Sequence, residues 1–66
     1  PPHFHAYYNE HQAEIEISTL EILNGSLPKR IRNLVIEWAV EHRQELFDDW
    51  ELMRNDNPPK PIDPLV

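Results

Sequence analysis

The residues best suited to chemistry are two histidines, His3 and His5, near the start of the chain. Residues two apart in a β-strand project from the same face, so a strand here would present both imidazoles side by side. Glu14 and Glu16 lie in a second strand-like segment and are expected opposite them. Two imidazoles and a carboxylate suit Zn²⁺, Cu²⁺, Ni²⁺ or Fe²⁺. The sequence therefore indicates a candidate divalent-metal site at His3, His5 and Glu14 or Glu16, without requiring a cofactor.

The alternative for these residues is an exposed polar face that holds no ligand. Histidine and glutamate on neighbouring strands form a cross-strand pair worth a few tenths to about 1 kcal/mol. The His-x-His spacing is a short motif that does not separate this alternative from metal binding. Both interpretations stay open at the level of the sequence.

A further histidine, His42, falls on the apolar side of a predicted helix, one turn after Trp38. Such a residue is more often a core histidine with a hydrogen-bonded ring than a catalyst. Asp49 lies two turns further on, and a buried histidine with an acid in reach would be a functional candidate. The candidate catalytic residues are thus His3, His5 and His42, and the sequence does not decide whether the protein is an enzyme.

Two segments of alternating residues must position the first histidines. Period-two alternation predicts two half-buried strands joined by a turn within Asn9–Gln12. One face of this hairpin is expected to carry Phe4, Ala6, Tyr8, Ala13, Ile15 and Ile17. The opposite face is expected to carry His3, His5, Tyr7, Glu14 and Glu16, away from the helix. His3 and His5 are therefore not expected to meet His42 within one subunit.

The remainder of the chain divides into a short strand, a helix and a tail. A third strand is predicted at Leu20–Leu23, ended by the turn pair Asn24-Gly25. Ser26 as the N-cap and Pro28 in the first turn predict one helix over about 27–55. Four prolines in 56–66 predict an extended tail. The expected fold is α+β, with a single domain at 1–55: an antiparallel hairpin or three-stranded meander, with strands at about 3–23, packed on one long C-terminal amphipathic helix.

The predicted helix carries two apolar lines. The main stripe, which should face the hairpin, contains Ile31, Leu34, Val35, Trp38, Leu46 and Met53. The second line contains Ile36, Val40 and Phe47, with Trp50 nearby. A hairpin covers only one side of a helix, so this second set is the candidate interface for another subunit or a partner, unless an upstream strand or the tail covers it.

Composition limits the classes of function. The chain has 66 residues, no cysteine and a net charge of −6. The charge argues against direct binding of nucleic acid, although Lys29, Arg30 and Arg32 are clustered. The missing cysteines fit a reducing, cytoplasmic setting, and no apolar run is long enough to span a membrane.

The order of these signals resembles a known bacterial family. The hairpin opens with Pro1-Pro2-His3-Phe4-His5-Ala6, the helix opens with Gly25-Ser26-Leu27-Pro28, and Glu37-Trp38, His42, Glu45-Leu46 and Trp50 follow along it. This pattern is similar to Domain of Unknown Function 4160. Members usually carry one more apolar strand before this opening string, and this chain starts at Pro1 without Met, which leaves open a segment upstream.

The resemblance implies a cytoplasmic bacterial protein encoded beside a small partner in a toxin–antitoxin-like pair. It carries over no established catalytic residues. The leading hypothesis is therefore a protein-interaction component that forms a homo-oligomer or binds a small protein partner. The alternative is a metal-dependent or histidine-based hydrolase, such as a ribonuclease toxin, or a small metal-binding protein.

Overall fold

The two alternating segments form adjacent antiparallel strands in the computed structural model, which describes residues 1–65. Strand β1 (His3–Tyr8) pairs with β2 (His11–Glu16), and Asn9 takes a positive φ of 51° in the two-residue loop between them. Ala13, Ile15 and Ile17 are buried on the face that Phe4 and Ala6 share. The predicted alternation is therefore confirmed, with Tyr8 exposed at the end of the hairpin.

A third strand, β3 (Ile22–Ser26), pairs with β2 and completes a sheet in the order β1-β2-β3. The prediction that Asn24-Gly25 ends this strand is wrong, because Gly25 lies within it opposite Ala13. Gly25 has a φ of 79°, and a Cβ atom there would lie 2.1 Å from the backbone oxygen of Gln12. The glycine is thus required by a close approach of two strands rather than by a turn.

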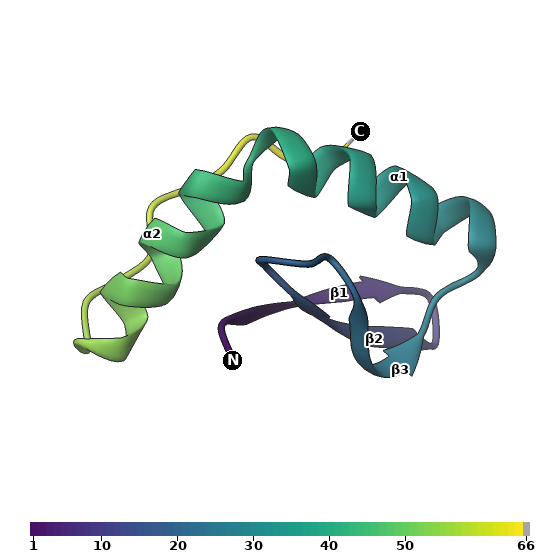
Figure 1. Cartoon of the computed structure of the whole chain (residues 1–66), viewed down its shortest axis with the longest axis horizontal. Helices are drawn as coiled ribbons and strands as arrows, with labels where there is room; N and C mark the ends of the chain where they lie inside the picture. The colour runs from purple at the N-terminus through teal and green to yellow at the C-terminus, as the bar shows by residue number, and fades with distance from the viewer. Residues whose placement is uncertain (66) are drawn as a thin grey trace.

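Two helices, α1 (Lys29–Glu41) and α2 (Arg43–Arg54), cover one face of the sheet (Figure 1). The α+β class and the three-stranded meander are confirmed, but the expectation of one long helix is wrong. The chain bends at His42, which has φ −113° and ψ 18°. A straight helix of this length would run past the small sheet, whereas the bend brings the buried side chain of Leu46 into the core.

The first helix also starts later than expected. Ser26 ends β3 opposite Gln12, so it does not cap the helix. Pro28 is the N-cap residue instead, and its carbonyl oxygen accepts the backbone N–H of Arg32 at 2.8 Å. Sheet pairing of Ser26 with β2 has taken the place of the predicted cap.

The bend redistributes the two apolar lines. Ile36, Phe47 and Trp50 from the second line pack partly against the core, whereas Val40 is 54% exposed. In the main stripe, Leu34 is 39% and Met53 51% exposed, although both were expected to face the sheet. A single helical phase cannot describe both helices, because the break at His42 rotates α2 relative to α1.

The proline-rich segment after α2 has no helix or strand and runs back along both helices (Figure 1). The backbone N–H of Lys60 donates to Asp49 Oδ1 at 2.8 Å, and Trp38 Nε1 donates to the carbonyl oxygen of Asp63 at 2.8 Å. Ile62 packs against the core between these two anchors. Val66, the last residue of the predicted tail, lies outside the described residues. Within 1–65, neither helix has the length and apolarity to cross a bilayer.

Candidate metal centre

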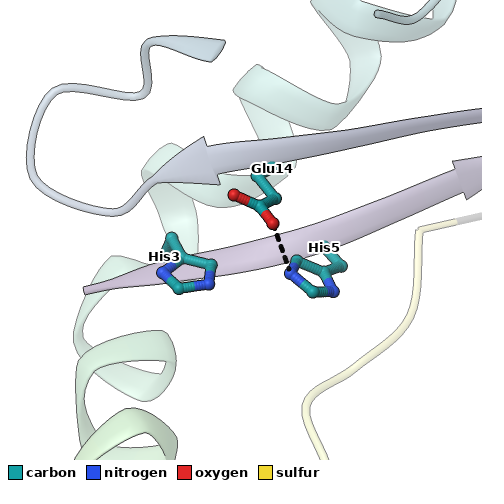
Figure 2. A group of neighbouring side chains, drawn as sticks. All are labelled: His3, His5 and Glu14. Atoms are coloured by element: carbon teal, nitrogen blue, oxygen red, sulfur yellow. Dashed lines mark ion pairs between the residues drawn. The ribbon is translucent and has the colours of Figure 1, made fainter. Parts of the chain in front are cut away.

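The sheet brings His3, His5 and Glu14 together on its outer face (Figure 2). The two histidines project from β1, two residues apart, and Glu14 reaches across from β2. Glu14 is the direct cross-strand partner of His5 in the register of the hairpin. The sequence prediction of a His-His-Glu cluster is therefore matched by the geometry for these three residues.

The donor atoms are close enough to share an ion after small side-chain rotations. One donor atom from each residue lies within 4.8 Å of the other two, and His5 Nε2 lies 3.4 Å from Glu14 Oε1. Tetrahedral ligands bound at about 2.0–2.1 Å are about 3.4 Å apart, so the widest gap has to close by about 1.4 Å at most. The side chains of His5 and Glu14 are 39% and 34% exposed, which leaves them room to move.

Each histidine has a second contact that orients its ring. Nδ1 of His3 lies 3.0 Å from the carbonyl oxygen of Pro1. A carbonyl only accepts, so this nitrogen carries the proton and Nε2 keeps the lone pair that a metal needs. Nδ1 of His5 lies 3.4 Å from the hydroxyl of Tyr7, which can donate or accept, and Nε2 of His5 lies 3.4 Å from the Glu14 carboxylate. The contact with Pro1 thus supports the tautomer that frees Nε2 of His3, whereas the contacts of His5 are compatible with either tautomer.

The second predicted acid, Glu16, has a different partner. It lies opposite His3 in the register, but its Oε2 accepts a hydrogen bond from the hydroxyl of Ser18 at 2.7 Å. Among residues 1–65, the group with metal-ligand spacing contains Glu14 and not Glu16. The turn that follows β2 places Ser18 beside Glu16, which explains why the two acids differ.

The third candidate catalytic residue, His42, stands apart from this group. Its Nδ1 lies 2.6 Å from Glu45 Oε1, and its ring lies 5.0 Å from the ring of Trp38. Asp49, the acid expected to assist His42, instead accepts the backbone N–H of Lys60. Among residues 1–65, the group with metal-ligand spacing does not contain His42, which lies at the junction of the two helices.

The outer face of the sheet is not fully separated from the helices, contrary to expectation. The ring of Trp50 in α2 lies 5.0 Å from the ring of His3, at the start of β1. Trp50 and Asp49 line one cleft together with His3 and His5. Sequence reasoning placed Trp50 in an interface, because the pattern of a straight helix does not show that α2 turns towards this end of the sheet.

A comparison with family models identifies the chain. Residues 1–51 match the model described as Domain of unknown function (DUF4160). The chain belongs to this family. The DUF4160 match contains both helices up to Glu51 and all three residues of the metal-ligand group, while the tail lies beyond it. No curated protein and no solved structure matches the chain. The DUF4160 description names no activity, and membership of a fold family does not by itself imply one.

Proposed function

We propose that this DUF4160 chain binds a divalent transition metal through His3, His5 and Glu14. The observation that supports it is the placement of two imidazoles and a carboxylate within 4.8 Å of one another on adjacent strands. The net charge of −6 adds a negative field that favours a cation. Mixed nitrogen and oxygen donors suit Zn²⁺, Ni²⁺, Co²⁺ or Cu²⁺. Three protein ligands leave at least one coordination position for water or another ligand.

Calorimetric titration of Zn²⁺ and Ni²⁺ into the protein tests this proposal. We expect one site per chain, and we expect His3→Ala/His5→Ala to abolish it. Glu14→Gln should weaken binding by about tenfold or more, while Glu16→Gln, the matched control on the same strand, leaves it unchanged. Equal, weak binding by the wild type and the double variant would show that these residues form a cross-strand polar pair and not a metal site.

The open coordination position also supports the hydrolytic alternative. A metal with such a position can lower the pKa of bound water and supply a nucleophile. The net charge of −6 disfavours binding of the RNA backbone. A hydrolase with this surface would therefore act on an uncharged or cationic substrate. Assays on metal-loaded protein and on the His3→Ala/His5→Ala variant distinguish it from binding alone.

A second proposal concerns association with another protein chain. Val40 is 54% exposed on α1, and the acids Glu37 and Glu41 flank it on the solvent side of the helix. Val40 offers an apolar contact for a second copy, and the acidic face around it suits a small basic partner, as in a toxin–antitoxin-like pair of the bacterial cytoplasm. The oligomeric state of the protein tests this proposal.

A further inference from the structure

A cleft of about 380 Å³ lies beside the His3–His5 pair, between the start of β1 and α2. Its two sides have different chemistry. The strand contributes the imidazoles of His3 and His5 together with Phe4, and α2 contributes Leu46, Trp50 and Met53 together with Asp49. A small set of polar donors facing an apolar wall is typical of sites that hold a small molecule.

The α2 side of the cleft contains one buried side chain and one exposed side chain. Leu46 is buried in the core and cannot move far, whereas Met53 is 51% exposed. Trp50 lies between these two residues in the sequence, and its ring centroid is 5.0 Å from the ring centroid of His3. A flat or branched apolar group placed here would contact an indole face and a flexible thioether, both of which bind aromatic rings favourably.

We infer that this cleft holds the apolar, preferably aromatic, part of a ligand whose donor atom occupies the open coordination position of the metal. This inference rests on the metal site proposed above. His3 and His5 belong to the metal-ligand group and also line the cleft, whereas Glu14 does not line it, so the cleft adjoins the metal-ligand group through these two rings. The donor fixes one end of the ligand, and the wall selects the group attached to it.

The charges around the cleft narrow the ligand further. Asp49 lines it from α2, and Glu14 supplies a second carboxylate at the metal group. These two carboxylates offset the two positive charges of a bound divalent ion, so that in a chain with a net charge of −6 an anionic head gains no net attraction. The ligand class is therefore a neutral nitrogen donor, or an uncharged carbonyl donor, attached to an aromatic or branched apolar group.

The test compares imidazole with 4-phenylimidazole on Co²⁺-loaded protein, since both offer the same nitrogen donor. The visible spectrum of Co²⁺ reports direct coordination, and the fluorescence of tryptophan reports contact with the wall. We expect 4-phenylimidazole to bind about tenfold more tightly than imidazole, or better, because its phenyl ring leaves water. Met53→Ser should reduce this ratio while the affinity for Co²⁺ stays within about twofold, and Trp50→Leu should reduce the ratio together with some loss of Co²⁺ affinity, because the indole packs against His3.

Leu23→Ser is the matched control, because Leu23 is an exposed leucine on β3 and does not line the cleft. It should leave the ratio unchanged, and circular dichroism checks that each variant is folded. Equal affinity for the two probes on metal-loaded protein overturns the inference and leaves the metal site standing. A ratio that Trp50→Leu and Met53→Ser do not change overturns it as well. Absence of Co²⁺ binding in the wild type overturns both proposals.

Discussion

At the scale of single residues, His3 illustrates how one side chain serves several neighbours. Its Nδ1 is committed to the carbonyl oxygen of Pro1, and its ring packs between His5 and Trp50 at centroid distances of 5.3 and 5.0 Å. The remaining nitrogen is therefore held in a defined direction before any ion arrives. Such preorganisation reduces the entropy lost on binding, which matters for side chains as exposed as these.

Gly25 gives the sharpest prediction at this scale. Gly25→Ala should destabilise the protein by about 1–3 kcal/mol, because the added Cβ meets the backbone oxygen of Gln12 and the φ of 79° disfavours any side chain. Urea denaturation followed by circular dichroism measures this loss.

The neighbouring Asn24→Ala is the matched control for Gly25→Ala, since Asn24 is exposed in the same strand, and its midpoint should stay close to that of the wild type. A Gly25→Ala protein as stable as Asn24→Ala would show that β2 and β3 do not approach each other so closely.

The residues of the metal-ligand group can be predicted from the sequence, whereas the residues of the apolar side of the cleft cannot. Period-two alternation and an even-length loop fix which side chains share a sheet face, so His3, His5 and Glu14 follow from the pattern. The difference between Glu14 and Glu16 depends on a hydrogen bond from Ser18, which no periodicity encodes. Trp50 reaches His3 only because α2 changes direction, and that is a tertiary property.

At the scale of the elements, the junction of the two helices is tied to the sheet by Arg43. Its Nε donates to the carbonyl oxygen of Ile17 at 3.0 Å, in the turn after β2. Neither proline nor glycine occurs near His42, so the sequence contains none of the usual signals of a helix break. The bend is a response to packing on a small sheet, and the two helices were for that reason predicted as one.

Arg43→Met tests the importance of this tie. Methionine retains the unbranched apolar stem of arginine but cannot donate a hydrogen bond. The partly buried carbonyl oxygen of Ile17 then loses its partner, which should lower the free energy of unfolding by about 1–3 kcal/mol. Thermal denaturation of the full chain should show a clear fall in the melting temperature.

Arg54→Met provides the comparison, because Arg54 bonds to Glu51 in an exposed pair that contributes little. If both variants melted at the same temperature as the wild type, the contact between Arg43 and Ile17 would have no role in holding the junction.

At the scale of the whole molecule, the tail docks back onto both helices. Ile62 packs against the core, and the tail is fixed at Asp49 and Trp38 by hydrogen bonds of 2.8 Å. The four prolines of this segment do not show where it docks. Val40 is then the member of the predicted interface that remains exposed, while Ile36, Phe47 and Trp50 lie partly against the core.

The association proposal leads to a test at position 40. If the α1 face mediates self-association, the protein should sediment as more than a monomer at micromolar concentration. Val40→Glu should weaken that association by about tenfold or more, because it places a like charge at the centre of a symmetric contact. Helical circular dichroism should be unchanged, since Val40 is 54% exposed.

Gln44→Glu adds the same charge at an exposed position in α2 and is the control for Val40→Glu. It should leave the sedimentation coefficient at the wild-type value. A wild-type monomer under these conditions would exclude self-association through α1, and equal effects of the two variants would point to net charge rather than to this surface.

The central position of β2 has a consequence for the exchange of backbone hydrogens with solvent. β2 has a hydrogen-bonded neighbour on each side, whereas β1 is paired in the described residues with β2 alone. Amides of β2 should therefore exchange mainly through global unfolding, and those of β1 through local fraying. His3 and His5 stand on the strand that frays, and Glu14 stands on the strand that does not. An ion shared by the three would fasten β1 to β2, so that protection of β1 amides would rise to the level of the sheet centre.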